Sequence, residues 1–189
     1  MKWCLSVSVV FAVPSLCLAG FAFVEQGEGL ELTWNGELVS RFVVDEGNKP
    51  FLYPVLGPGG VPMTRSYPME EVAGESQDHP HHRSLWFGHQ GIQGVDTWHE
   101  AKTIEERAEK KKDPVERDAY VKEAMAKLGR TRPMGIGRIM ASGEAAELLT
   151  RNDYEDAEGN KLLADERLYR FRMPTETERA FEVVMTFRA

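Results

Sequence analysis

The stretch that decides the fold covers residues 30–45 and reads Leu30-Glu31-Leu32-Thr33-Trp34-Asn35-Gly36-Glu37-Leu38-Val39-Ser40-Arg41-Phe42-Val43-Val44-Asp45. Apolar and polar side chains alternate on both sides of Asn35-Gly36. Alternation with a period of two indicates strands with one buried face, and Asn-Gly is the dipeptide best suited to a two-residue hairpin turn. The sequence therefore predicts a β-hairpin centred on this dipeptide.

Beyond the hairpin, most of the chain also has the pattern of strands. Residues 49–62 are rich in proline and glycine, and we expect an ordered loop there that could pair only at a sheet edge, because proline lacks an N–H donor. The further predicted strands cover residues 84–89, 137–140, 145–152, 162–173 and 180–188, with a turn at 158–160. This pattern predicts a mostly antiparallel β-sandwich.

Residues 101–132 differ from their surroundings and are typical of a helical insertion. Thr103 with Glu106 has the pattern of a capping box, and Asp113-Pro114 is typical of an N-cap followed by the first helical residue. These signals predict two helices, at about 104–112 and 114–128. Their apolar face is thin, so we expect a solvated pair packed on one side of the β scaffold.

The first twenty residues have the pattern of a secretory signal peptide. A single charge at Lys2 precedes an apolar run over residues 5–13, and small residues follow near Ala19 and Ala22, either of which fits a cleavage site. An uncleaved anchor is the alternative, although the run is short for a bilayer span. We expect a signal peptide at 1–20, a β-sandwich domain at 21–189, a secreted or periplasmic location, and no membrane span after the leader is removed.

Composition narrows the classes of function. A chain of 189 residues with 42% hydrophobic content fits one domain. Cys4 and Cys17 both lie in the predicted leader, so the mature chain would have no thiol for disulfides, thiolate catalysis or cysteine-based zinc sites. The net charge of −7 argues against nucleic acid or an anionic membrane as partner.

All five histidines fall between residues 79 and 99, beside acidic, arginine and tryptophan side chains. Imidazole titrates near neutral pH and is a common metal ligand, so this concentration predicts one polar site. The candidate catalytic residues are His79, His81, His82, Arg83, His89, His99 and Glu100. The candidate substrate-binding residues are Arg65, Tyr67, Trp86, Asp96 and Trp98. Histidine would exchange protons with a sugar, and tryptophan would stack on a pyranose face.

Two other interpretations of the same residues stay open. In extended backbone, His79 and His81 project to one side, and with Asp78 and the more distant His89 or His99 they could bind one divalent metal ion such as zinc, manganese or iron. Alternatively, the histidines and arginine hold a long loop by hydrogen bonds to backbone carbonyls, while the tryptophans fill the core.

Three stretches in this order resemble a known family: Pro50-Phe51-Leu52-Tyr53-Pro54-Val55-Leu56-Gly57-Pro58, Asp78-His79-Pro80-His81-His82-Arg83-Ser84-Leu85-Trp86-Phe87 and Gly94-Val95-Asp96-Thr97-Trp98-His99-Glu100. The chain is similar to the bacterial family named methane oxygenase PmoA in genome annotation, and the similarity extends to residues 150–154 and 165–172. It implies a secreted or periplasmic β-sandwich with no established reaction, encoded near sugar-metabolism genes.

The resemblance carries two further expectations. A literal methane monooxygenase subunit would need several apolar spans of about 20 residues, and none follows the leader, so we reject that role. Similar proteins continue past the position of Ala189 with more strands and a second polar motif, so we expect the domain to be incomplete at its C-terminus. A likeness to mutarotase-like sandwiches is an analogy of fold only.

Together these observations predict an exported, carbohydrate-active β-sandwich whose 79–100 loop lines a pocket for a sugar or another small molecule. Acid–base chemistry on the sugar is the first hypothesis. A non-catalytic carbohydrate-binding module and a histidine-ligated metalloprotein are the alternatives.

Overall fold

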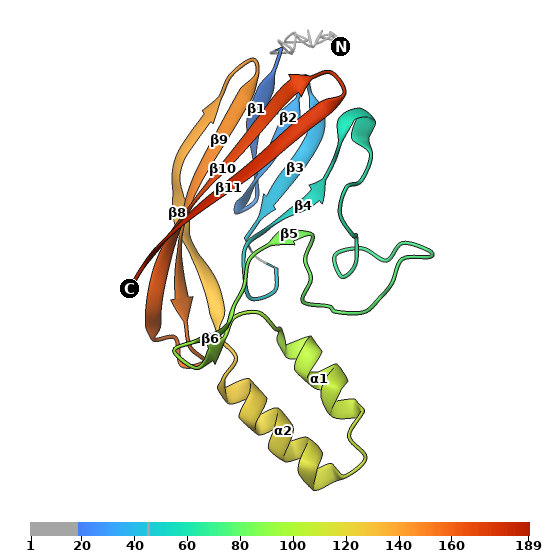
Figure 1. Cartoon of the computed structure of the whole chain (residues 1–189), viewed down its shortest axis with the longest axis vertical. Helices are drawn as coiled ribbons and strands as arrows, with labels where there is room; N and C mark the ends of the chain where they lie inside the picture. The colour runs from blue at the N-terminus through green and yellow to red at the C-terminus, as the bar shows by residue number, and fades with distance from the viewer. Residues whose placement is uncertain (1–18, 45) are drawn as a thin grey trace, which may run out of the picture.

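Two antiparallel sheets face each other in the computed structural model, which describes residues 19–44 and 46–189 (Figure 1). The predicted signal peptide lies almost wholly outside these residues. The first sheet has the order β1-β2-β3-β4-β5, with β1 Phe21–Gln26, β2 Gly29–Trp34, β3 Glu37–Val43, β4 Phe51–Val55 and β5 Leu85–Trp86. The second has the order β11-β10-β9-β8, with β8 Arg130–Ala141, β9 Ala145–Glu155, β10 Lys161–Thr175 and β11 Glu178–Arg188.

Smaller elements lie in the segments between these strands. They are the 3-10 turn η1 Pro58–Gly60, the short hairpin of β6 Gln90–Ile92 and β7 Val95–Asp96, and the helices α1 Ala101–Glu109 and α2 Pro114–Ala126. The predicted mostly antiparallel β fold with two helices is thus confirmed. No helix in the described part of the chain is both long and apolar enough to cross a membrane.

The hairpin predicted around Asn35-Gly36 is formed by β2 and β3. Asn35 and Gly36 have φ angles of 51° and 83°, the left-handed conformation that a tight hairpin turn of this type needs. The two strands pair antiparallel from Trp34 opposite Glu37 to Leu30 opposite Phe42. Their apolar faces then turn toward the second sheet.

The hydrophobic core lies between the two sheets, as their alternation requires. Phe42 of β3 packs on Tyr169 of β10, with ring centroids 5.8 Å apart. The buried apolar side chains of this core are Phe21, Leu30, Leu32, Val39, Phe42, Leu52, Val55, Ala146, Leu148, Tyr169 and Phe171. Both sheets contribute, so neither half could bury its apolar face without the other.

Two strand predictions need correction. Within the segment expected to be a loop, residues 51–55 form β4, which lies between β3 and β5. Pro54 is tolerated there because the β3–β4 register shifts between Ser40 and Phe42, and because β5 pairs only with Phe51 and Leu52. The strand expected over residues 84–89 is reduced to Leu85–Trp86.

The helices also differ from expectation in detail. α1 begins at Ala101, and Thr103 is a buried residue of its first turn rather than an N-cap. Asp113 does cap α2 as predicted, because its carboxylate accepts hydrogen bonds from the backbone N–H groups of Val115 and Glu116. The pair projects from one end of the sandwich instead of lying along its side, and β8 begins before the predicted insertion ends (Figure 1).

Candidate functional site

The histidine-rich loop makes a turn where extended backbone was expected. His79 has a φ of 50°, and the backbone N–H of His82 donates to the His79 carbonyl over 2.9 Å. The rings of His79 and His82 therefore stack, with centroids 4.8 Å apart, while His81 turns inward. The prediction that His79 and His81 project to one side is wrong, because it assumed an extended backbone where the chain turns.

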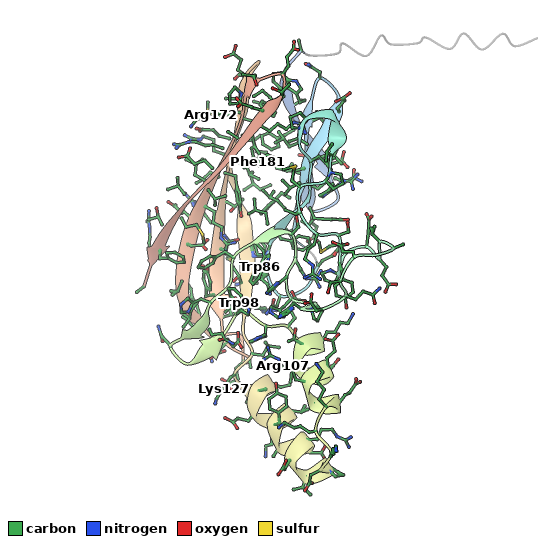
Figure 2. The ribbon with its side chains drawn as sticks, turned by 45° about the vertical axis from the view of Figure 1, so that its right-hand side comes forward. Trp86, Trp98, Arg107, Lys127, Arg172 and Phe181 are labelled. Atoms are coloured by element: carbon green, nitrogen blue, oxygen red, sulfur yellow. The ribbon has the colours of Figure 1, made fainter. Side chains whose placement is uncertain are left out.

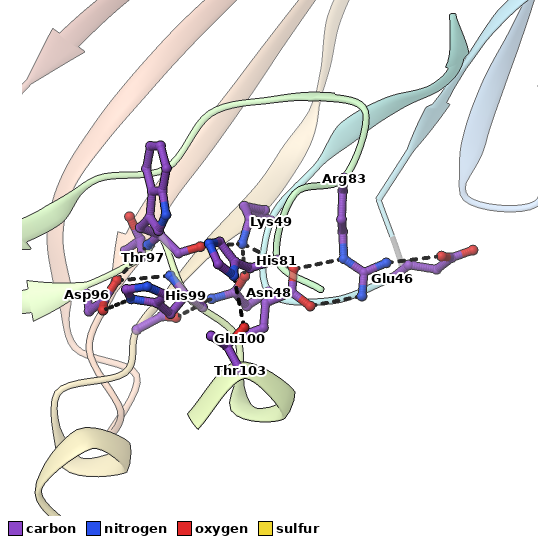
Figure 3. A network of polar contacts seen from close by, with 12 residues as sticks. Glu46, Asn48, Lys49, His81, Arg83, Asp96, Thr97, His99, Glu100 and Thr103 are labelled. Atoms are coloured by element: carbon purple, nitrogen blue, oxygen red, sulfur yellow. Dashed lines mark hydrogen bonds and ion pairs between the residues drawn. The ribbon is translucent and has the colours of Figure 1, made fainter. Parts of the chain in front are cut away.

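His81 is buried in the interior of the protein. It is 1% exposed, and its Nδ1 lies 3.0 Å from the hydroxyl of Thr103 in α1 (Figure 3). Burial, together with the positive charges of neighbouring side chains, lowers the pKa of His81 to about 3. The ring is therefore neutral at pH 7. Its hydrogen bond with Thr103 links the histidine-rich loop to the first turn of α1.

Glu100 lies at the centre of a buried ion-pair network (Figure 3). Arg83 binds it with two hydrogen bonds of 2.8 and 2.9 Å, and the ammonium of Lys49 is 3.1 Å from Oε1. Burial alone would raise the pKa of Glu100, but the two cations more than offset it and keep this pKa below its ordinary value. Both oxygens of the predicted catalytic carboxylate are thus occupied by structural partners.

Asn48 and Lys49, which precede β4, are network residues that the sequence did not reveal. The Asn48 amide donates to the carbonyls of His99 and Gly129, and Lys49 donates to the carbonyl of Trp98. Burial lowers the pKa of Lys49 to about 8, against the raising effect of Glu100. A single Asn-Lys pair beside a proline has no pattern that marks it as buried, so no local signal could have identified it.

Asp96 and His99 form a dyad that faces a different part of the surface. Asp96 Oδ2 is 2.7 Å from His99 Nδ1, and Gln90 Nε2 is 2.9 Å from the same nitrogen. Burial tends to raise the pKa of Asp96, but hydrogen bonds from His99 and from the Trp98 backbone hold it below its usual range. Both dyad residues line a recess of about 350 Å³ between the β6–β7 hairpin and the helices.

Four predicted residues do meet in one pocket. This tryptophan pocket, about 400 Å³ in volume, is lined by Arg65, His82, Ser84, Trp86, Phe87, Gly88 and Trp98. Figure 2 shows Trp86 and Trp98 close together near the end of the sandwich that leads to the helices, and their ring centroids are 4.6 Å apart at 66°. Trp98 is 36% exposed, so part of its ring is open to solvent.

The polar side chains of the tryptophan pocket are held in place. Arg65 donates to the carbonyls of Ser76 and Asp78 and lies 3.2 Å from the Asp78 carboxylate. Burial and nearby positive charges lower the pKa of His82, so its ring is neutral at pH 7. A Cβ added at Gly88 would lie 2.9 Å from the Trp86 ring, so a glycine there permits the packing of this wall.

The remaining predicted residues lie elsewhere. Tyr67 is buried, and its hydroxyl accepts a hydrogen bond from Lys102. His89 is exposed outside the tryptophan pocket, and His79 pairs with Asp78 at the surface. Among residues 19–44 and 46–189, no three histidine, aspartate, glutamate or cysteine side chains converge as metal ligands. Within the proposed set, His79 pairs with Asp78 at the surface, whereas His81 is buried against Thr103.

Comparison with known proteins identifies a family whose function is unknown. A family model described as "Family of unknown function (DUF6807)" matches residues 29–189. No curated protein and no solved structure matches the chain. The matched region includes the tryptophan pocket, the ion-pair network and every strand of the two sheets except β1.

Proposed function

The chain belongs to DUF6807, a family of unknown function, and we propose that it binds a carbohydrate in the tryptophan pocket. The observation that carries this proposal is the partly exposed ring of Trp98 beside Trp86 in a pocket that also presents polar side chains. The volume lies within the range of about 300–1,000 Å³ that is typical of small-molecule sites.

A sugar ring matches this arrangement of groups. Its C–H face packs against an aromatic ring, while its hydroxyls need hydrogen-bond partners around the edge. Trp98 offers the aromatic face, and the neutral imidazole of His82 offers both a donor and an acceptor. The hydroxyl of Ser84, 2.6 Å from that of Thr64, adds a second polar group at the rim.

The lining favours binding without turnover. Hydrolysis of a glycosidic bond ordinarily uses a pair of carboxyl groups across the bond, and no carboxylate is among the described residues that line this pocket. Glu100 is bound by Arg83 and Lys49, and Asp96 faces the other recess. We therefore place the non-catalytic carbohydrate-binding module ahead of the acid–base enzyme.

The test is calorimetric titration with a panel of methyl pyranosides and disaccharides, on wild type and on Trp98→Ala. We expect saturable binding of at least one sugar and a loss of about tenfold or more in affinity for the variant, because the stacking face is removed. Trp98→Phe keeps an aromatic face and should retain most of the affinity. Tyr120→Ala, which removes an aromatic ring lining the other recess, is the matched control and should change nothing.

The possible results separate the hypotheses. Binding that survives Trp98→Ala, or no saturable binding of any sugar, would contradict the proposed site. Detection by chromatography of a chemically altered sugar would contradict binding without turnover. It would favour the hypothesis of an acid–base enzyme instead.

A further inference from the structure

A second recess lies between the two sheets, on the other side of Trp86. This inter-sheet recess has a volume of about 200 Å³. Leu85, Trp86 and Phe87 contribute to its lining from β5 and the residue after it. The second sheet contributes Arg167, Tyr169, Val183 and Met185. The lining is thus largely apolar and aromatic, with a single charged side chain.

That charged side chain, Arg167, is held in a buried network. It is 1% exposed, its Nε donates to Asp165 over 2.8 Å, and its Nη2 donates to the Tyr154 hydroxyl over 3.0 Å. The other oxygen of Asp165 accepts a hydrogen bond from the amide of Asn152 over 2.6 Å. Tyr169 is a further hydrogen-bond partner of Arg167, and both residues line the recess. A guanidinium has more N–H groups than these three partners use.

The charge balance decides what kind of ligand suits this guanidinium. Asp165 already neutralises Arg167 inside the protein, so a bound carboxylate would bring an additional, uncompensated buried negative charge. An uncharged oxygen acceptor can take an N–H of Arg167 without that penalty. The polar group of a ligand should therefore be a carbonyl rather than an acid.

The size and lining decide the rest of the ligand. An apolar cavity of about 150 Å³ is known to accommodate benzene, so a recess of this volume suits one substituted aromatic ring. The aromatic walls at Trp86 and Phe87 favour edge or offset stacking with such a ring.

We propose that the inter-sheet recess is a second binding site, which takes a small uncharged aromatic molecule whose carbonyl oxygen accepts a hydrogen bond from Arg167. Two of its seven lining residues, Trp86 and Phe87, also border the tryptophan pocket, whereas Trp98, on which the carbohydrate proposal rests, does not line the recess. Its ligand differs from a sugar in having an apolar body.

The experiment compares three probes of similar shape by ligand-observed NMR and fluorescence titration: acetophenone, ethylbenzene and benzoate. We expect acetophenone to bind saturably and about tenfold or more tightly than ethylbenzene, which lacks the oxygen, and than benzoate, which carries the charge. Val183→Phe should fill the recess and abolish acetophenone binding. Val115→Phe, the same substitution at a 78% exposed position of α2, is the matched control.

Each other result would overturn the proposal. Ethylbenzene binding as tightly as acetophenone would show that Arg167 is not used, and tighter binding of benzoate would refute the charge argument. Acetophenone binding that persists in folded Val183→Phe would place the probe elsewhere. If circular dichroism shows that Val183→Phe does not fold, the ranking of the three probes on wild type still decides.

Discussion

Replacing His81 by asparagine should remove a specific part of the pH dependence of stability. His81 is 1% exposed, and its pKa is lowered from the ordinary value of 6.5 to about 3. In the unfolded chain the same ring takes up a proton below pH 6.5, whereas the folded protein does not. The neutral His81 therefore costs no free energy of unfolding above pH 6.5. As the pH falls from 6.5 toward 3, its contribution lowers the free energy of unfolding progressively.

The size of the effect follows from the linkage relation. Each pH unit below 6.5 lowers the free energy of unfolding by about 1.4 kcal/mol, so the contribution of His81 between pH 7 and pH 5 is about 2 kcal/mol. Asparagine does not titrate, and its side chain can still reach the Thr103 hydroxyl that lies 3.0 Å from His81 Nδ1. Wild type should thus lose about 2 kcal/mol more than the variant over this interval.

Urea denaturation at pH 7, 6 and 5 measures this difference directly. The comparison of the two proteins cancels the pH dependence that is common to both. The interval also lies above the range in which Glu100 and Asp96 take up protons, since the pKa of each is below its ordinary value. A difference between the two proteins that stays constant from pH 7 to pH 5 would refute the assignment of His81 as a sealed, neutral residue.

Two further substitutions test the network and the hairpin, again by urea denaturation. Glu100→Gln should cost about 3–5 kcal/mol because it leaves the buried ammonium of Lys49 without its carboxylate, whereas Glu46→Gln, at a 53% exposed carboxylate, should cost under about 1 kcal/mol. Equal losses would contradict the network. Gly36→Ala should cost about 1 kcal/mol because φ is +83° and nothing lies within 4 Å of the added Cβ, so that only backbone strain acts. Gly143→Ala, which also has open space but no positive φ, should cost nothing, and a similar loss there would contradict this reasoning.

The features that the sequence determined by itself are those set by neighbouring residues. The hairpin at Asn35-Gly36 follows from a two-residue turn and the alternation around it, and the start of α2 follows from Asp113 and the proline after it. The strands β9, β10 and β11 were also predictable, because alternation indicates which face of a strand is buried, whereas only the end of β8 was predicted. These signals are local, so a single chain contains all the information that they need.

Which polar side chains are buried and hydrogen-bonded inside the protein, and which face a pocket, depends on the tertiary structure. Four of the predicted residues, Arg65, His82, Trp86 and Trp98, meet around one pocket, while His81 is fastened to Thr103 in the first turn of α1. Periodicity could not separate these two adjacent histidines, since the difference comes from a turn and from packing against distant segments.

The same limit explains the role of Glu100. Its partner Lys49 lies 51 residues away in the chain, and nothing near either residue indicates the pair. A buried charge is stabilised by whatever opposite charge the fold brings within a few ångströms, and that choice depends on how β4, the histidine loop and α1 come together. The sequence therefore determined the strands and the turn, and the packing of those elements decided which residues form the buried network and which line a pocket.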